Sequence, residues 1–387
     1  MTATQWTNAF LDEMRTQGDV LADNAVNTLF QEGDIHAVDA LMQTLVRNDG
    51  LPSDKLPPVI LDYLAQTSAI PLLDADKVRR GEELFGLYGP EILMVLGFYS
   101  LPAAYAARKG VQVLYRTGYL LHRPLRRVFE TTQMVVDVMA KGGLEAEGRG
   151  VRSAQKVRLM HAAIRHLVSQ DPKNPWDPEF GVPVNQEDLA GTLMTFSYIV
   201  LDGLKRMGIT LSDADQEAYL HAWLAIGRIM GVREDLLPAT VAAARELTTL
   251  IHQRQIASSP EGKALANALI QGYQQLMPEH FLKGVPASLT HFFLDVDPFT
   301  GQDIAAMLDI PPADWTEVIA HIVGAIGNVL GQFGLEHGLV GAVFGYVSRA
   351  MIEAMLLVER GGTRAPFYIP EHLRRLWKLE ERKVAAA

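Results

Sequence analysis

Cysteine is missing from all 387 residues of the chain. Its absence excludes disulfide bonds, thiolate zinc sites, iron–sulfur clusters and a cysteine nucleophile. A metal in this protein would therefore depend on ligands from His, Asp, Glu, Lys, Tyr or Met.

Positive charge is scarce. The chain has 35 Lys and Arg residues against 45 Asp and Glu residues, which gives a formal net charge of −10. Because binding to a phosphate backbone depends on clustered cations, we do not expect the protein to bind nucleic acid.

Long uninterrupted apolar runs are also missing. A membrane-spanning helix needs about 20 consecutive apolar residues. The segment 90–107 is interrupted by Pro102, and the segment 321–358 carries Glu336 and His337 near its middle. The N-terminus lacks the basic start and apolar core of a secretory signal. We therefore expect a cytoplasmic protein without a transmembrane segment, and peripheral contact with a membrane stays open.

The sequence does contain helical periodicity. Hydrophobic residues make up 48% of the chain. In nearly every long segment they recur at spacings of three and four, and alternating runs are few. Besides the two helices discussed below, the expected helices include 35–47, 75–87, 90–107, 111–121, 186–207, 314–330, 334–360 and 370–382. The pattern predicts an all-α protein, in which an N-terminal helical cap over 1–74 packs as one compact unit with a helical domain over 75–387.

Seven glycines recur at alternating spacings of three and four within the segment 321–358. They are Gly324, Gly327, Gly331, Gly334, Gly338, Gly341 and Gly345. Each costs up to about 1 kcal/mol relative to alanine inside a helix, so the stripe needs a compensating gain. Close packing of a neighbouring helix is the favoured interpretation. A flat ligand or a contact between subunits are the alternatives.

The expected helix over 153–169 carries histidines and arginines beside its apolar residues. Arg158, His161 and Arg165 are three and four residues apart and share a face. His166 points in a different direction, so the two histidines are poor candidates for a shared metal. His161 is then either a core imidazole bonded to a carbonyl group or the ligand of a haem iron, with the arginines near the anionic propionates.

The expected helix over 124–141 has a related character. Arg127, Glu130 and Thr131 fall on one face of it. An Arg–Glu pair at this spacing is usually a solvated ion pair on the surface. The surrounding sequence is mostly apolar, so the wall of a buried pocket is the alternative.

At these residues the sequence resembles the latex clearing protein and MpaB-type oxygenase family. The resemblance is carried by the segments 74–92, 100–120, 126–139 and 158–168, and more loosely by 189–208 and 223–238. It implies a single large helical domain with a globin-like core that binds haem b, flanked by extra N- and C-terminal helices. It also implies an oxygenase that uses O2 to attack an apolar small-molecule or polymer substrate, with an isoprenoid C=C bond as a candidate target.

The resemblance assigns roles on the proximal side of the haem. His161 stands in an Arg-x-x-His-Ala motif that in latex clearing proteins supplies the iron ligand. Arg158 and Arg165 would then bind the haem propionates or tie helices together.

On the distal side, the resemblance assigns catalytic positions to Arg127, Glu130 and Thr131. Glu130 replaces a lysine that can cap the iron in the family. A further pocket threonine is Thr195 in preference to Thr192.

The family's rubber-cleaving members also use an upstream glutamate as a base. No carboxylate matches it near Gly110–Val113, where Gln112 is the nearest polar residue. This departure and the replaced lysine distinguish the chain from the rubber-cleaving members, while the haem ligand is retained.

Three other functions stay open from the sequence. The protein could be a haem-binding sensor or carrier without turnover. It could be a haem-free helical interaction protein with His161 in its core. It could also bind non-haem iron through Glu130 and histidines. The sequence leaves the substrate, the distal iron ligand and the oligomeric state unassigned.

Overall fold

The computed structural model describes residues 6–31, 56–68, 74–145, 148–276 and 284–312. Some expected features lie outside these residues, namely the helices at 35–47, 314–330, 334–360 and 370–382 and the glycine stripe Gly324 to Gly345.

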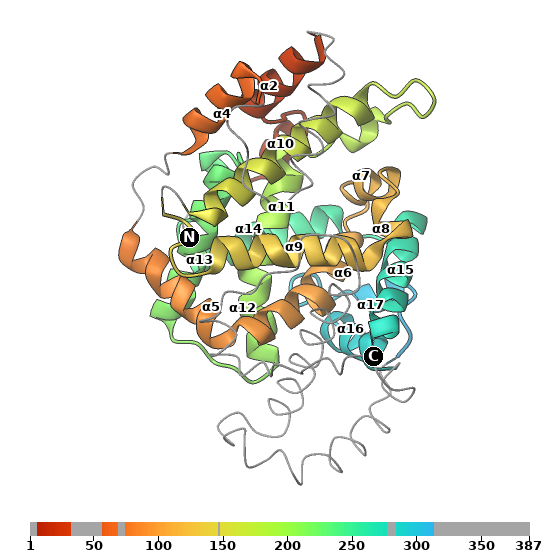
Figure 1. Ribbon diagram of the computed structural model, residues 1–387. Helices are drawn as coiled ribbons and strands as arrows, with labels where there is room; N and C mark the ends of the chain where they lie inside the picture. Colours follow the sequence, from red (N-terminus) through yellow and green to blue (C-terminus); the bar gives the residue numbers. More distant parts are fainter. Residues whose placement is uncertain (1–5, 32–55, 69–73, 146–147, 277–283, 313–387) are drawn as a thin grey trace, which may run out of the picture.

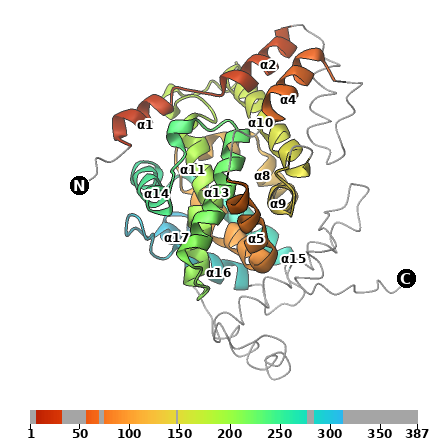
Figure 2. The same ribbon diagram turned by 90° about the vertical axis from the view of Figure 1, so that its left-hand side faces the viewer.

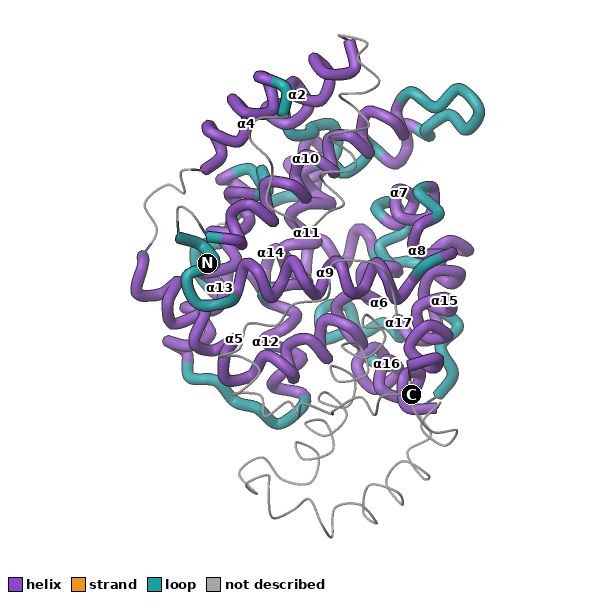
Figure 3. The backbone as a smooth tube through the Cα atoms, in the orientation of Figure 1, coloured by secondary structure: helices purple, strands orange, loops and turns teal. Residues whose placement is uncertain are grey.

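The described residues are mainly helical and confirm the all-α class (Figures 1 and 3). The α-helices of ten or more residues are α2 (Val20–Gln31), α4 (Pro58–Ser68), α5 (Ala75–Val95), α9 (Pro124–Met139), α10 (Arg149–Ser169), α11 (Gln186–Phe196), α13 (Asp213–Ile229), α14 (Val241–Gln255), α15 (Pro260–Leu276) and α16 (Val285–Leu294). The shorter elements are α1 (Asn8–Met14), η2 (Leu96–Ser100), α6 (Leu101–Tyr105), α7 (Val111–Arg116), α8 (Tyr119–His122), η3 (Pro178–Phe180), α12 (Tyr198–Arg206), η4 (Glu234–Leu236) and α17 (Ile304–Met307). Apart from one bridge between Ala107 and Ile256, these residues form no β-structure. The globin-like core and the division after residue 74 stay predictions.

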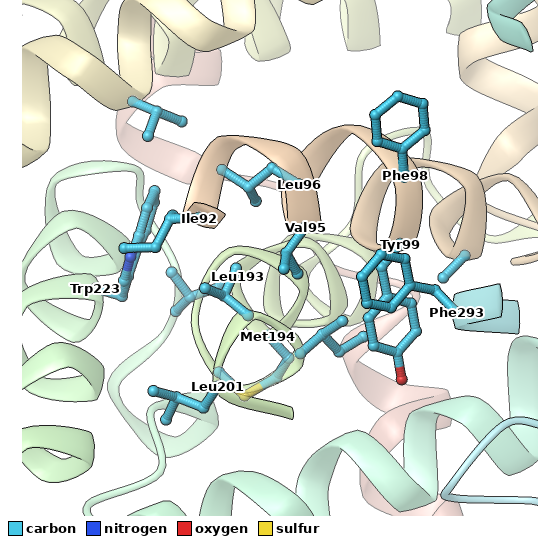
Figure 4. Close-up of a cluster of buried hydrophobic side chains, with 14 of the residues drawn as sticks. Ile92, Val95, Leu96, Phe98, Tyr99, Leu193, Met194, Leu201, Trp223 and Phe293 are labelled. Carbon is cyan, nitrogen blue, oxygen red and sulfur yellow. The ribbon is translucent and has the colours of Figure 1, made fainter. Parts of the chain in front are cut away.

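The longest helical run passes through the core. α5, η2 and α6 follow one another from Ala75 to Tyr105, and by length and composition alone this run could cross a membrane. Most of its apolar part is buried inside the protein, as in a core helix. Figure 4 shows Val95, Phe98 and Tyr99 of this run among buried side chains from other helices.

Two of the expected helices are divided by local backbone chemistry. The segment 186–207 breaks at Ser197, whose hydroxyl donates to the carbonyl of Leu193 (2.8 Å) and whose backbone leaves the helical region. A serine bonded to the preceding turn in this way bends a helix. α7 and α8 are separated by Gly118, which has a φ of 65° that residues with a Cβ rarely adopt.

α9 and α10 form a hairpin that positions the candidate site. At its closed end, a Cβ on Gly150 would lie 2.6 Å from the Cα of Val138, so the two backbones can approach this closely only because residue 150 is glycine. Arg127 and His161 lie equally far from this closed end, one on each helix. The hairpin therefore brings these two residues into the same region.

α2 and α4 lie against α10 in two perpendicular views (Figures 1 and 2). Together they bury a small core of their own, separate from the main one. Its members include Val26, Leu29, Ile60, Leu159 and Ala163. The N-terminal helices are thus packed directly on the helix that carries His161.

Candidate functional site

His161 lies in the middle of α10 and is enclosed by protein. Its Nδ1 is fully buried and has no hydrogen-bond partner among the residues that the structure describes. Burial is the main reason that its pKa falls to about 3, and the charges of Arg127 and Arg165 lower it further. The imidazole is therefore neutral at neutral pH, and a neutral imidazole is the form that binds metals.

The imidazole of His161 is half-buried. Buried polar groups normally have a hydrogen-bond partner. A core imidazole can bond to a carbonyl group through either ring nitrogen, and Nδ1 of His161 makes no such bond to the described residues.

Arg127 lies near His161 and also near Tyr105 of α6. Its charge lowers the pKa of the histidine and opposes the increase that burial causes in the pKa of the tyrosine. Tyr105 is fully buried, and its hydroxyl has no hydrogen-bond partner in the described part of the chain. Burial keeps its pKa well above the usual value, so the hydroxyl remains a protonated donor. Sequence reasoning missed Tyr105, because a tyrosine inside an apolar run resembles an ordinary core residue.

Glu130 and Thr131 lie on the same helix as Arg127, but their side chains have other partners. Glu130 Oε1 accepts hydrogen bonds from the hydroxyl of Tyr119 (3.0 Å) and from Arg126 Nε (3.0 Å). The nearest nitrogen of Arg127 is 4.0 Å from Glu130 Oε2. The hydroxyl of Thr131 donates to the carbonyl of Arg127 (3.0 Å). Glu130 is therefore held toward α8.

Thr195 is buried on α11. Its hydroxyl donates to the carbonyl of Thr192 (2.7 Å), and its own carbonyl accepts from Ser100 Oγ (2.7 Å). The bond from Ser100 ties α11 to η2. Thr192 lies about one turn earlier and is exposed to solvent, even though other faces of α11 pack against α12, α13 and α14.

A carboxylate does stand next to the segment Gly110–Val113. Asp188 of α11 places its Oδ1 3.1 Å from the position of a Cβ on Gly110. Burial raises the pKa of Asp188, and the ion pair with Arg15 (2.9 Å) opposes this. Gln112 is buried and donates to the carbonyl four residues before it (3.2 Å). Sequence spacing could not reveal Asp188, because α11 is far from this segment along the chain.

The two arginines that flank the histidine are bonded to protein groups. Arg158 binds both carboxylate oxygens of Asp19, with Nε at 2.5 Å and Nη2 at 2.7 Å. Arg165 binds the carboxylate of Asp23 through Nη1 and a backbone carbonyl through Nε at 3.0 Å. Both therefore tie helices together, which is one of the two roles expected for them.

The available ligand side chains fit a haem better than a non-haem iron site. Within the described ranges, no three His, Cys, Asp or Glu side chains gather as a metal site. The non-haem iron site suggested for Glu130 and the histidines is therefore not formed among these residues. A haem needs a single axial imidazole from the protein. His161 is neutral, enclosed and unpartnered at Nδ1, so it meets this requirement.

Comparison with known proteins identifies the family. Residues 83–327 match the family model described as the catalytic domain of ER-bound oxygenase mpaB/B′ and rubber oxygenase. This match covers more than half of the chain. The chain belongs to this family. Arg127, Glu130, Thr131, His161 and Thr195 all lie within the matched residues.

Two individual proteins agree with this assignment. The rubber oxygenase of Streptomyces sp. (strain K30) is 28% identical over 257 residues, which are 64% of this chain and 61% of the relative. The match thus spans less than two thirds of that protein. The structure of latex clearing protein in the closed state is similar with a TM-score of 0.72 at 23% identity, and covers 92% of this chain and 95% of that one. The second likeness supports the fold.

Proposed function

We propose that this protein is a haem b-dependent oxygenase that uses O2 to oxidise an apolar, isoprenoid-like substrate at a C=C bond. The observation that carries the proposal is His161, a neutral and enclosed imidazole with an unpartnered nitrogen, in a chain from an oxygenase family. The likeness to a rubber oxygenase supports an isoprenoid polymer or oligomer as the substrate class.

His161 would hold the haem iron through its imidazole. When bound, haem supplies the binding and activation of O2. Burial serves this role, because it keeps the proton off the imidazole down to a pH of about 3. Arg158 and Arg165 already bind aspartates, so the propionates would need other partners.

Arg127 and Tyr105 would act on polarised oxygen atoms inside the site. The guanidinium is a permanent cation that approaches the carboxylate of Glu130 only to 4.0 Å. The hydroxyl of Tyr105 stays protonated and has no partner among the described residues. Donors fixed in a dry site stabilise developing negative charge better than donors in water.

Glu130 would stand at the edge of this arrangement. To reach the iron or a substrate, its carboxylate must first leave the hydroxyl of Tyr119 and the guanidinium of Arg126. It would therefore act as a proton donor or acceptor in contact with Tyr119 rather than as a resident iron ligand.

The haem ligand is tested by visible spectra of the full-length protein, purified after expression with a haem supply. We expect a Soret band in the wild type and loss of most of it in His161→Ala. His166→Ala is the matched control on the same helix. Its ring stacks on Phe30 (4.3 Å between centroids) and bonds to Asn27 (2.7 Å), so this variant should keep the band. A normal band in His161→Ala would assign the iron to another residue.

Turnover is tested separately by O2 uptake with dispersed polyisoprene oligomers. Substrate-dependent uptake is expected of an oxygenase. A haem spectrum without such uptake would support the sensor or carrier instead, and a colourless wild type would support the haem-free interaction protein.

A further inference from the structure

Two aspartates at the start of α2 connect this helix to α10. Asp19 accepts a hydrogen bond from the backbone N–H of Ala22 (3.4 Å), and Asp23 accepts one from the N–H of Asp19 (3.0 Å). Carboxylates are stabilised at a helix N-terminus by its dipole. The same two carboxylates bind Arg158 and Arg165 of α10.

Both ion pairs are mostly shielded from solvent. The side chains of Arg158 and Asp19 are 10% and 6% exposed, and those of Arg165 and Asp23 are 7% and 23% exposed. Removing one partner of a buried pair leaves an uncompensated charge and is strongly destabilising, whereas removing both is tolerated better. The two arginines also donate to the carbonyls of Ile229, Pro183 and Val184, but only the aspartates at the start of α2 neutralise their charge in these pairs.

These pairs flank the proposed iron ligand. Arg158 and Arg165 lie three residues before and four residues after His161, so both ion pairs stand within about one turn of it on α10. The two aspartates lie before residue 83, outside the part of the chain that matches the oxygenase family model.

We infer that Asp19 and Asp23 are positioning residues for His161, which clamp α10 against α2 and balance the positive charge beside the imidazole. The inference rests on the proposed function, because it takes His161 as the iron ligand. Neutralising Asp23 would leave the charge of Arg165 uncompensated about one turn from His161. Added positive charge favours the reduced iron, so the reduction potential should rise.

The first experiment measures the reduction potential of the haem-loaded, full-length protein. We expect a higher potential in Asp23→Asn and a lower one in Arg165→Gln than in the wild type. The reduction potential of the double variant Asp23→Asn/Arg165→Gln should return most of the way to the wild-type value, because its net charge equals that of the wild type. Asp12→Asn is the control. It removes the same charge from α1, where Asp12 pairs with Arg254 (2.6 Å), and should leave the potential unchanged.

The second experiment needs no haem. In the full-length haem-free protein labelled with ¹⁵N-histidine, Asp19→Asn and Asp23→Asn should shift the ring resonances of His161, and Asp12→Asn should not. Asp19→Glu keeps the charge and should restore most of the wild-type spectrum. If the wild type binds no haem, the proposed function fails, while these resonances still test the clamp. The clamp is overturned if both aspartate variants match Asp12→Asn in potential and in the His161 resonances.

Discussion

Arg127 lies close enough to His161, across the hairpin of α9 and α10, for its charge to lower the pKa of the imidazole. Burial is the larger cause of this low pKa, and the cation adds to it. Both effects favour the neutral ring. If Arg127 were only a surface ion-pair partner of Glu130, its charge would not be expected to change the pKa of a histidine on another helix.

Arg127→Gln should therefore raise the pKa of His161 above about 3, although it should stay below 6.5 because the ring remains buried. The measurement is a ¹⁵N-histidine titration of the haem-free protein. Arg126→Gln is the control, since Arg126 binds Glu130 and lies over the ring of Tyr119 at 5.5 Å. Equal shifts in the two variants would show that the effect is not specific to Arg127.

The buried histidine should also make the haem-free protein sensitive to acid. The pKa of His161 is 6.5 without the fold and about 3 within it, so between these values the unfolded chain binds more protons than the folded one. The free energy of unfolding should then fall as the pH decreases from 6.5 toward 3, by at most about 1.4 kcal/mol per pH unit for this group.

Urea unfolding at several pH values checks this dependence. His161→Gln should remove this part of the slope, whereas His122→Gln, which changes an exposed histidine, should keep it. The depressed pKa would be contradicted if all three proteins lost stability equally between pH 6.5 and pH 4.

The sequence predicted the parts of the fold that depend on local pattern. Both helices of the α9–α10 hairpin follow apolar spacing, and Pro124 at the first turn of α9 is typical of a helix start. α10 begins at Arg149, before the expected start at residue 153. The expected helices at 75–87 and 90–107 proved to be one run, because Pro90 kinks the chain near Tyr88 without ending it.

The sequence could not show which side chains meet in the site. Arg158 pairs with Asp19, and Asp188 lies next to Gly110, although the two members of each pair are far apart in the sequence. Such contacts depend on how the helices pack, which apolar periodicity does not predict. Motif spacing placed His161 and Arg127 on the correct helices, and only the fold showed that the imidazole lacks a partner at Nδ1.

Glu130→Gln should lower the pKa of Tyr119. Burial and the carboxylate of Glu130 together raise the pKa of Tyr119 to about 12, so removing the negative charge should bring it part of the way back toward 10. Ultraviolet difference titration against Tyr119→Phe isolates this phenol. The half-exposed pair with Arg126 should contribute less than about 1 kcal/mol to stability. An unchanged titration would mean that Glu130 has another position in solution.

Gly231→Ala should disrupt the ion pair between Asp19 and Arg158, which joins α2 to α10. A Cβ on Gly231 would lie 2.4 Å from Asp19 Oδ2 and 2.6 Å from Arg158 Nε, and the φ of 82° adds backbone strain. Gly301→Ala is the matched control, with a φ of 72° and no atom of the described residues within 4 Å of its Cβ.

The control should lose about 1–2 kcal/mol of unfolding free energy, which is the cost of a left-handed residue with a Cβ. Gly231→Ala should lose about 3–5 kcal/mol, because it also separates a buried ion pair. Denaturant unfolding of both variants measures the difference. Similar losses would mean that Asp19 and Arg158 can move apart without consequence, and that α2 does not fix the helix that carries His161.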